Sequence, residues 1–361
     1  MTTLRVMSSV GHERVGRGRG EHDGGVPAVR PDVAQFERHR RELTGYCYRM
    51  LGSGSEADDA VQETMLRAWR GADRFDGRAS VRTWLYRIAT NVCTDMHRSP
   101  QRRARPVDLG PSRDPDPRHL VDVLPEDRWI TPIADDAVID PCGDPAQVAA
   151  ARDTIRLAFV SALQRLPARQ RAALVLCEVL QWSAVDAAEL LDTSVSSINS
   201  ALQRARATMA EAPGSPAPSS GVDADQQALL DRYVDAFERY DMDALAELLH
   251  QDVIQTMPPF AMWLRGRDDV IAWNLGPGAK CRGSRLLPGR ANGCPAFAQY
   301  RADPDGGHVP WALHVLEFRG DRVAAYHAFL DTEVFARFGF PARLSADVAA
   351  SPPAPLDADR P

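Results

Sequence analysis

Proline-rich stretches divide this chain of 361 residues into segments that cannot share one continuous helix or strand pattern. The clearest stretch is 212–221, Ala-Pro-Gly-Ser-Pro-Ala-Pro-Ser-Ser-Gly. Proline lacks the amide hydrogen and fixes φ, so a helix interior or a central strand does not tolerate such a run. Residues 100–148, rich in proline and aspartate, predict another linker. The length suits two or three domains. We expect a disordered tail at 1–31, a helical domain at 32–99, an acidic linker at 100–148, a second helical domain at 149–211, a linker at 212–223, a mixed domain at 224–342 and a disordered tail at 343–361.

Charge is distributed unevenly along the sequence. The formal net charge is −6, which by itself argues against a general nucleic-acid binder. Residues 36–105 nevertheless hold 14 arginines against nine acidic residues. Residues 151–211 are close to neutral, with seven arginines against six acidic residues. Basic charge therefore gathers in the first helical domain, as a footprint on DNA requires.

The cysteines have no spacing that indicates a metal site or a disulfide framework. The sequence holds no C-x-x-C pair and no histidine cluster, so free thiols in a reducing compartment are favoured. No segment has the apolar length of a membrane span, and the first residues lack the apolar stretch of a signal peptide. We therefore expect a cytoplasmic protein with no metal and no cofactor. The cysteines are Cys47, Cys93, Cys142, Cys177, Cys281 and Cys294.

Residues 59–69, Asp-Ala-Val-Gln-Glu-Thr-Met-Leu-Arg-Ala-Trp, predict an amphipathic helix. Ser53 or Ser55 can cap it, and the acidic residues that follow are favoured in its first turn by the helix dipole. In an isolated helix, such a polar side is most often only a solvated face. We expect an apolar stripe of Ala60, Met65, Leu66 and Trp69, opposite Asp58, Asp59, Gln62 and Glu63.

Residues 82–91, Arg-Thr-Trp-Leu-Tyr-Arg-Ile-Ala-Thr-Asn, combine cations with aromatic rings on a second helix, for which Ser80 is placed as the N-cap. Arginine neutralises phosphate and aromatic faces hold unstacked bases, so this combination suits DNA whose strands are separated. Trp84 can equally be a core residue, and Asn91 can be an ordinary polar position. We expect Val81, Leu85, Ile88, Ala89 and Val92 to face the core.

Together these two runs resemble region 2 of sigma-70 family initiation factors, in particular the extracytoplasmic-function (group 4) type. The resemblance implies that the first helix docks on a coiled coil of the largest subunit of core RNA polymerase. It also implies that the second helix holds the strand-separated −10 promoter element, with Asn91 beside a pocket for a flipped base. The implied polymerase contacts are Asp58, Asp59, Gln62, Glu63 and Leu66, and the implied −10 contacts are Arg82, Trp84, Arg87 and Asn91.

Residues 163–206 predict a helix-turn-helix unit. Pro167 stands at a helix start, Ser183 and Asp186 have capping-box spacing, and Ser194 can cap the last helix. Response regulators share this plan, so alone it is only moderately specific. After a region-2-like block it resembles sigma region 4, which implies recognition of the −35 element. The last helix is expected to turn Val195, Ile198 and Leu202 to the core, Ser196, Ser197, Asn199, Ser200 and Gln203 to the bases, and Arg204 and Arg206 to phosphates.

The linker at 100–148 is acidic as well as rich in proline. Its simplest interpretation is a solvated tether. The family resemblance implies a second interpretation, because the connector of a sigma factor threads the polymerase cleft and is displaced by nascent RNA. That channel accommodates polyanions, so an acidic strand can occupy it.

Residues 224–342 predict two helices and then strands, with clear alternation at 311–318. This order resembles the SnoaL-like α+β cone of the nuclear-transport-factor-two-like superfamily, and the run at 257–266 resembles the sigma-factor subgroup that carries this domain. Such cones can hold a small ligand, and some are isomerases or cyclases. No acid–base pair can be assigned here, which favours a regulatory or docking role over catalysis. Candidate pocket residues are Trp263, His314, Tyr326 and His327, although His314 can equally be a hydrogen-bonded sheet histidine.

The fold class that follows is multi-domain, with two all-α domains and a C-terminal α+β cone. We predict a sigma factor, not an enzyme, that binds core RNA polymerase and promoter DNA and directs initiation. The C-terminal domain would regulate it in cis through its short tether. A small-molecule ligand or an anti-sigma factor is a further candidate partner, and no membrane partner is expected. Two alternatives remain: a ligand-responsive helix-turn-helix regulator that acts without polymerase, and a SnoaL-like enzyme with accessory DNA-binding helices.

Overall fold

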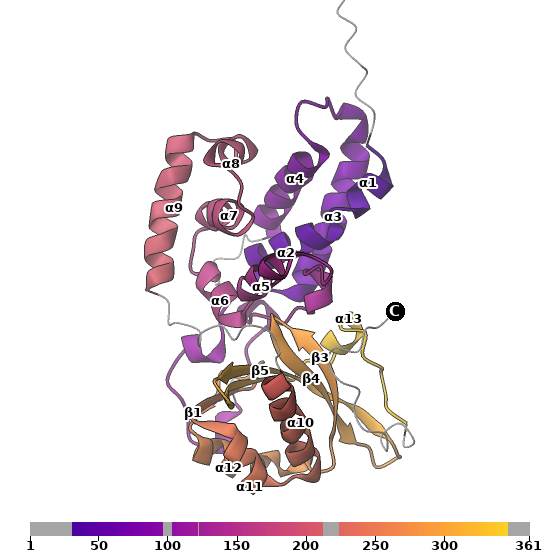
Figure 1. Ribbon diagram of the computed structural model, residues 1–361, viewed down its shortest axis with the longest axis vertical. Coiled ribbons are helices and arrows are strands. Elements are labelled where there is room, and N and C mark those ends of the chain that lie inside the picture. Colours follow the sequence, from indigo (N-terminus) through magenta and orange to yellow (C-terminus); the bar gives the residue numbers. More distant parts are fainter. Residues whose placement is uncertain (1–30, 97–102, 122, 212–223, 346–361) are drawn as a thin grey trace, which may run out of the picture.

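The computed structural model describes residues 31–96, 103–121, 123–211 and 224–345. Helices make up the upper part of Figure 1, and a sheet with its own helices makes up the lower part. The tails predicted at 1–31 and 343–361 lie outside the described residues except for residue 31 and residues 343–345. The linker predicted at 212–223 lies outside them entirely.

The first helical unit is a bundle whose longest helix is α3. Gly52 ends α2 in the left-handed conformation, with φ 73°, and Ser53 then caps α3 by accepting a hydrogen bond from the amide of Glu56 at 3.3 Å. Ser53 is therefore the cap, of the two serines that the sequence offered. The unit comprises α1 (Val33–Glu37), α2 (Arg40–Leu51), α3 (Gly54–Gly71), η1 (Ala72–Arg74) and α4 (Val81–Met96).

The buried side of α3 differs from the expected apolar stripe. Leu66 is 47% exposed and Trp69 is 55% exposed, so these two expectations were wrong. Mostly small residues, spaced by about one turn, are buried instead on the side of α3 that packs against α2 and α4. They are Ala57, Ala60, Val61, Thr64 and Ala68. On α4, by contrast, Leu85, Ala89 and Val92 are buried as expected.

The second helical unit holds the predicted helix-turn-helix. The hydroxyls of Ser183 and Ser194 accept hydrogen bonds from the amides of Asp186 and Ser197, which confirms both predicted caps. Ile198 and Leu202 are buried, but Val195 is 39% exposed because it stands in the first turn, beyond the packed part of the helix. The unit comprises α5 (Pro145–Asp153), α6 (Leu157–Gln164), α7 (Ala168–Leu174), a π-helical turn η6 (Val175–Val179), α8 (Ala184–Leu190) and α9 (Val195–Ala210).

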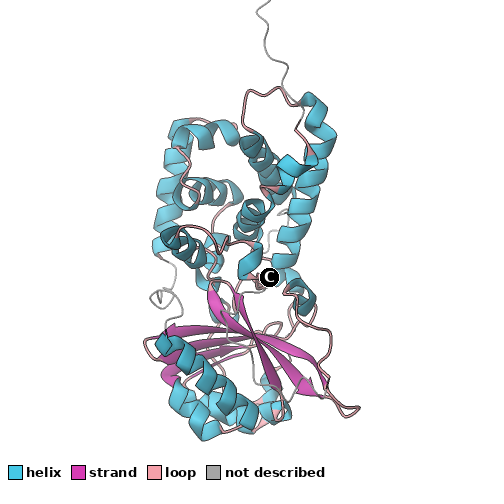
Figure 2. Cartoon of the chain, turned by 45° about the vertical axis from the view of Figure 1, so that its right-hand side comes forward, coloured by secondary structure: helices cyan, strands magenta, loops and turns pink. Residues whose placement is uncertain are grey.

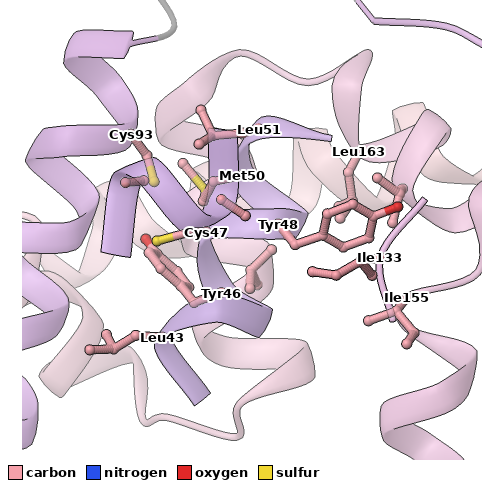
Figure 3. Close-up of a cluster of buried hydrophobic side chains, with 14 of the residues drawn as sticks. Leu43, Tyr46, Cys47, Tyr48, Met50, Leu51, Cys93, Ile133, Ile155 and Leu163 are labelled. Carbon is pink, nitrogen blue, oxygen red and sulfur yellow. The ribbon is translucent and has the colours of Figure 1, made fainter. Parts of the chain in front are cut away.

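Residues 129–135 of the linker are packed rather than solvated, whereas residues 108–114 and 125–127 are exposed. Trp129, Ile130 and Ile133 are at most 4% exposed, so the tether interpretation fails for these residues. Figure 3 shows Tyr48 of α2 beside Ile133, Ile155 and Leu163. Burying one such side chain stabilises the fold by about 2 kcal/mol, so the linker joins the core of both helical units. Its short helical turns are η2 (Pro106–Asp108), η3 (Pro117–His119), η4 (Glu126–Arg128) and η5 (Asp135–Ala137).

The C-terminal part is a six-stranded sheet with strand order β2-β1-β6-β5-β4-β3. The pair β1 and β6 is parallel, and the other neighbours are antiparallel. Its strands are β1 (Leu249–Thr256), β2 (Trp263–Arg265), β3 (Arg285–Ala291), β4 (Cys294–Ala302), β5 (His308–Arg319) and β6 (Arg322–Phe329). Its helices are α10 (Ala224–Arg239), α11 (Met242–Leu248), α12 (Arg267–Leu275), η7 (Pro277–Cys281) and α13 (Val334–Arg337).

The two faces of this sheet meet different partners, as Figure 2 shows. On the inner face, Phe297 and Leu316 pack with Tyr233 of α10 in the core of the C-terminal domain. On the outer face, Leu313 and Val315 belong to the same buried cluster as the helical units. The strand period of two residues separates these sets. The C-terminal domain is thus packed against the helical units and shares their core.

The described helices hold no segment with the length and apolar character needed to cross a membrane.

Candidate protein and nucleic-acid interfaces

The outward side of α3 carries a polar row around an exposed leucine. Asp59, Gln62, Glu63 and Leu66 are spaced by about one turn, so they share one side of the helix. Asp59 and Gln62 are exposed, and Glu63 is half-exposed. Asp58 is half-buried, and burial raises the pKa of its carboxyl group. An exposed apolar side chain with a polar rim is typical of a protein-binding surface.

On α4, Arg82 and Arg87 are both held by other parts of the chain. Arg82 donates through Nε to Glu42 at 2.9 Å, and its guanidinium lies over the rings of Tyr86 and Trp182. Arg87 donates to the main-chain oxygen of Glu189 at 3.2 Å. Because Trp182 and Glu189 belong to the second helical unit, that unit covers this side of α4.

The other two predicted −10 residues differ in burial. Trp84 is half-buried, with ring centroids 6.0 Å from Phe36 and 5.2 Å from Phe75, and it packs on the core of the first unit. This packing supports the alternative that Trp84 is a core residue. Asn91, one helical turn beyond Arg87, is exposed. Arg82 and Arg87 therefore lie on the side of α4 that contacts the second helical unit. Asn91 is exposed, and Trp84 packs on the core of the first unit.

The outward side of α9 is exposed within the part of the chain that the structure describes. Arg206 pairs with Glu178 of the π-helical turn through Nε at 3.0 Å. Arg204 is exposed on the same helix, so its guanidinium is accessible to a phosphate. The seven residues predicted to contact the −35 element are all exposed: Ser196, Ser197, Asn199, Ser200, Gln203, Arg204 and Arg206.

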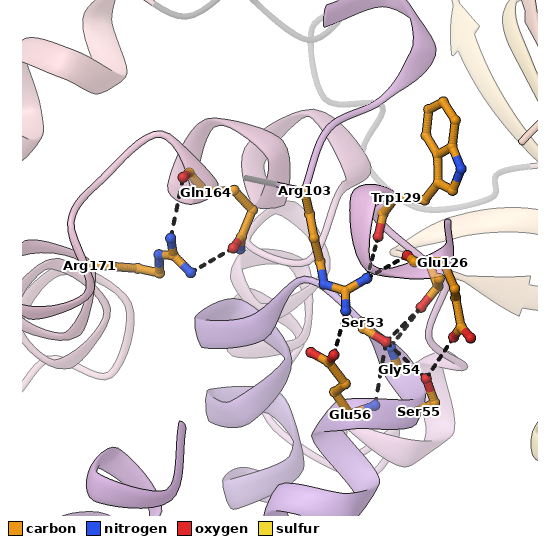
Figure 4. A network of polar contacts seen from close by, with 10 residues as sticks. Ser53, Gly54, Ser55, Glu56, Arg103, Glu126, Trp129, Gln164 and Arg171 are labelled. Carbon is orange, nitrogen blue, oxygen red and sulfur yellow. Dashed lines mark hydrogen bonds and ion pairs between the residues drawn. The ribbon is translucent and has the colours of Figure 1, made fainter. Parts of the chain in front are cut away.

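The linker is fastened to the first turn of α3 by a polar network, drawn in Figure 4. Arg103 donates to the carboxylate of Glu56 at 2.5 Å and to the main-chain oxygens of Glu126 and Trp129, each at 2.8 Å. The amide of Gly54 donates to Thr131 Oγ1 at 3.0 Å. Arg103 is 7% exposed, so a buried cation and its carboxylate fix the linker to the same helix that carries the polar row.

A second buried arginine joins the two helical units. Arg171 of α7 is 0% exposed, and its guanidinium donates to the main-chain oxygen of Met50 in α2. It also donates to Gln164 Oε1 at 2.6 Å and to the main-chain oxygen of Leu166 at 3.0 Å (Figure 4 shows Arg171 with Gln164). The contact between α2 and α7 is therefore polar at its centre.

The turn between β3 and β4 inserts into the junction of linker and helical units. Asn292 is 0% exposed and lies in the left-handed conformation, with φ 55°. Its Nδ2 donates to the Tyr48 hydroxyl at 2.6 Å and to the Ile155 main-chain oxygen at 2.7 Å, while its Oδ1 accepts from the amide of Ile133 at 3.1 Å. One side chain thus joins α2, the linker and the segment before α6.

The residues beside Asn292 reinforce this contact. The amide of Gly293 donates to Asp135 Oδ1 at 2.7 Å, and Arg290 reaches the other oxygen of Asp135 at 3.3 Å. A Cβ on Gly293 would lie 2.5 Å from the main-chain oxygen of Arg152, so only glycine fits there. Burial raises the pKa of Asp135 despite the arginine. Sequence reasoning missed this site, although Asn-Gly between alternating residues is a strong hairpin signal.

The four candidate pocket residues divide between the faces of the sheet. His314 and Tyr326 lie on the inner face, where Tyr326 Oη is 3.3 Å from His314 Nε2. Thr256 pairs with both Trp263 and His327 across the strands, so these two lie on the outer face, toward the linker. Trp263 donates there to the main-chain oxygen of Gly110 at 2.9 Å. The four residues therefore do not line one pocket.

Each histidine has a distinct environment. His314 is 0% exposed, its Nε2 is 2.8 Å from Gln299 Oε1, and burial lowers its pKa to about 3. Its Nδ1 is buried without a hydrogen-bond partner in the described structure. On the outer face, Glu317 lies 3.6 Å from His327; although burial opposes it, this contact lowers the pKa of Glu317. Within the described ranges, no three His, Cys, Asp or Glu side chains gather as around a metal ion.

Family models match three successive parts of the chain. Residues 35–103 match sigma-70 region 2, residues 156–209 match sigma-70 region 4, and residues 230–326 match a SnoaL-like domain. The order is the one that the motifs predicted.

Curated relatives extend the similarity over most of the chain. The ECF RNA polymerase sigma factor SigG of Mycobacterium tuberculosis H37Rv is 44% identical over 313 residues, which cover 85% of this chain and 83% of that protein. The ECF RNA polymerase sigma factor SigJ of the same strain is 29% identical over 255 residues, 68% of this chain and 72% of SigJ. The crystal structure of M. tuberculosis SigJ has a TM-score of 0.53 at 23% identity, covering 86% of this chain and all of that one, so the two share a fold.

Proposed function

Because the chain belongs to the extracytoplasmic-function group of sigma-70 RNA polymerase sigma factors, we propose that α3, α4 and α9 carry its contacts to polymerase, −10 DNA and −35 DNA. As a sigma factor it binds core RNA polymerase and directs transcription initiation at promoters. The observation that carries the assignment of surfaces is the open row on α3, where exposed Leu66 stands among polar side chains. Among the residues that the structure describes, Leu66 remains 47% exposed, so its packing inside the fold does not explain its place on this side of α3.

Core RNA polymerase is proposed to bind α3 through Asp58, Asp59, Gln62, Glu63 and Leu66. The acidic side chains can pair with basic residues of a partner, which gives orientation and a fast encounter. Leu66 supplies apolar area at the centre of the row, where interfaces gain most of their affinity. Arg103 of the linker pairs with Glu56, about one helical turn before Asp59, so polymerase binding and linker position are coupled in the proposal.

The two DNA surfaces are proposed to work in different ways. On α4, Arg82 and Arg87 would neutralise phosphates of separated strands while Asn91 meets an unstacked base. On α9, short polar side chains face the major groove, and Arg204 with Arg206 takes phosphates. Serines read bases weakly, so much of the −35 specificity is assigned to backbone positioning and DNA shape.

The C-terminal domain is proposed to regulate the sigma factor in cis. Its support is the turn at Asn292, which holds α2, the linker and the segment before α6 together. Any rearrangement that separates the two helical units must break at least one of these contacts, to Tyr48 or to Ile155. The same contact makes a separate anti-sigma factor unnecessary for holding the units together, although one can still be a partner.

Catalysis by the SnoaL-like domain is not part of the proposal. The inner-face histidine, His314, is held neutral by burial, and its contacts are Gln299 and Tyr326 rather than a carboxylate. The unpartnered Nδ1 supports instead a small ligand that donates a hydrogen bond. We assign the whole protein to the cytoplasm, where polymerase and DNA are found.

The test is assembly with core RNA polymerase, followed by transcription from a promoter that the complex selects. Replacing Asp59, Gln62 and Glu63 together by alanine is expected to abolish co-purification with the core enzyme. Asp321→Ala, at a side chain that is 93% exposed on the C-terminal domain, is the matched control. Retention of the triple variant by the core enzyme would remove α3 as the binding surface, and tight promoter binding without polymerase would favour a conventional regulator.

A further inference from the structure

Trp182 lies against the side of α4 that is proposed to take the separated −10 strand. Its indole ring is 5.1 Å from the Arg82 guanidinium and 5.1 Å from the ring of Tyr86, at a tilt of 56°. Arg82 also lies 5.2 Å above Tyr86, so the three side chains form one cation–aromatic cluster. Trp182 comes from the helix-turn-helix unit, and Arg82 and Tyr86 come from the first unit.

The backbone before α8 is shaped to present this ring. The helix that starts at α7 widens into the π-helical turn at Val175–Val179, a form that is rare and often found at functional positions. Gln181 then adopts φ 57°, a left-handed conformation that non-glycine residues seldom take. The Trp182 amide closes the turn by donating to the Leu176 main-chain oxygen at 3.0 Å.

The contact between Trp182 and the first helical unit leaves a polar group unsatisfied. The indole nitrogen of Trp182 is buried but donates no hydrogen bond within the described structure. A buried donor without an acceptor weakens a contact, because the donor has lost its water. Arg82 is also held by Glu42, which accepts a hydrogen bond from Tyr86 Oη at 3.2 Å as well. Arg82 and Tyr86 therefore keep their positions when Trp182 leaves.

We propose that Trp182 is an internal stand-in for an unstacked base: it occupies the Arg82–Tyr86 surface until the helix-turn-helix unit moves away. This inference rests on the proposed role of α4 in −10 binding. An indole and a nucleobase both offer a flat π face, which a guanidinium and an aromatic ring bind in the same way. Arg87 is engaged by Glu189 of the same unit, so one movement would uncover Arg82 and free Arg87. DNA strand binding and domain separation are thereby linked through competition for one surface.

The experiment uses the full-length protein and a fluorescein-labelled single-stranded DNA 20-mer of random sequence, with binding followed by anisotropy at low salt. Trp182→Ala is expected to tighten binding about two- to five-fold, the size of one exposed cation–π contact. Trp182→Phe keeps a ring over Arg82 and is expected to bind like the wild type. Val185→Ala, in α8 at a side chain that is 63% exposed, is the control for truncation in this segment.

The outcomes separate this inference from the role proposed for Arg82. Unchanged binding by Trp182→Ala, or an equal gain in Trp182→Phe, would overturn the stand-in. In the Trp182→Ala background, Arg82→Ala is expected to remove the gain. If that double variant still bound as tightly as Trp182→Ala, the −10 role of Arg82 itself would fail. Thermal unfolding of Trp182→Phe close to that of the wild type shows that the segment remains folded when the indole is absent.

Discussion

Asn292 Nδ2 lies 2.6 Å from the hydroxyl of Tyr48, so a hydrogen bond joins residues 244 positions apart in the sequence. Both side chains are fully buried. The Tyr48 hydroxyl in turn donates to the Thr131 main-chain oxygen at 3.0 Å. Through this short chain of contacts the C-terminal domain, the linker and the first helical unit share one buried polar site.

Asn292→Ala is expected to lower the free energy of unfolding by about 2 kcal/mol or more, because it leaves buried groups such as the Ile155 oxygen and the Ile133 amide without their partner. Urea unfolding followed by circular dichroism measures the change. Asp321→Ala, in the exposed turn between β5 and β6, should change it by less than about 0.5 kcal/mol. A loss no larger than that of the control would show that the turn is not a stabilising junction.

His314 predicts a dependence of stability on pH. Burial lowers its folded-state pKa to about 3, below its ordinary value, so the unfolded chain binds a proton that the folded chain does not. The contribution of this group is fully present above the unfolded pKa and is lost as pH falls toward the folded pKa. Between about pH 6 and 4 it should lower the free energy of unfolding by about 1.4 kcal/mol per pH unit.

The measurement is urea unfolding of the wild type and of His314→Gln at pH 6.5 and 5. The variant is expected to lose this part of the pH dependence, because glutamine keeps a hydrogen-bonding side chain but does not titrate. Val185→Ala, at an exposed side chain that does not titrate, should retain the wild-type slope. Identical slopes for all three proteins would mean that His314 is not held neutral by the fold.

Leu66→Ala separates binding from folding. The side chain is 47% exposed, so stability should change by less than about 0.5 kcal/mol. Affinity for core RNA polymerase should fall about five-fold or more if Leu66 stands at the centre of the interface. Surface plasmon resonance with immobilised core enzyme gives the affinity. Leu275→Ala on α12, at 58% exposure, is the control that should bind normally.

Arg204→Ala tests the assignment of phosphate contacts on α9. Holoenzyme with this change should bind a duplex promoter less tightly, and the slope of log affinity against log salt should become shallower by about one unit. Filter binding over a series of salt concentrations supplies the slope. Arg239→Ala serves as the comparison, since Arg239 is an exposed arginine in the last turn of α10, in the C-terminal domain. An unaltered slope for Arg204→Ala would remove it from the DNA surface.

The sequence predicted the local elements better than their contacts. Ser53, Ser183 and Ser194 cap helices as their side-chain chemistry requires, and the alternation at 311–318 lies in β5. Whether α3 buries Leu66 or its alanines depends on how closely α2 approaches, and periodicity within one helix does not determine this. The proposed binding surfaces came from the family resemblance, because composition alone predicts only a solvated helix for α3.

The linker shows a further limit of such reasoning. Its proline and aspartate content favoured a tether, yet Trp129, Ile130 and Ile133 are buried against parts of the chain distant in sequence. Three apolar side chains outweighed the polar average of the segment because each removes a large area from water. The contacts of Asn292 could not be predicted either, because a local hairpin signal does not indicate which part of the fold the hairpin will contact.

Arg171 places a buried charge in the contact between the two helical units. Its guanidinium has given up all its water to reach the oxygens of Met50 and Leu166, so a dehydrated cation stands at the centre of their contact. When α7 leaves α2, water returns to that cation and offsets part of the lost hydrogen bonding. A contact made only of leucines would gain no hydration on opening, whereas this one would regain the hydration of its cation.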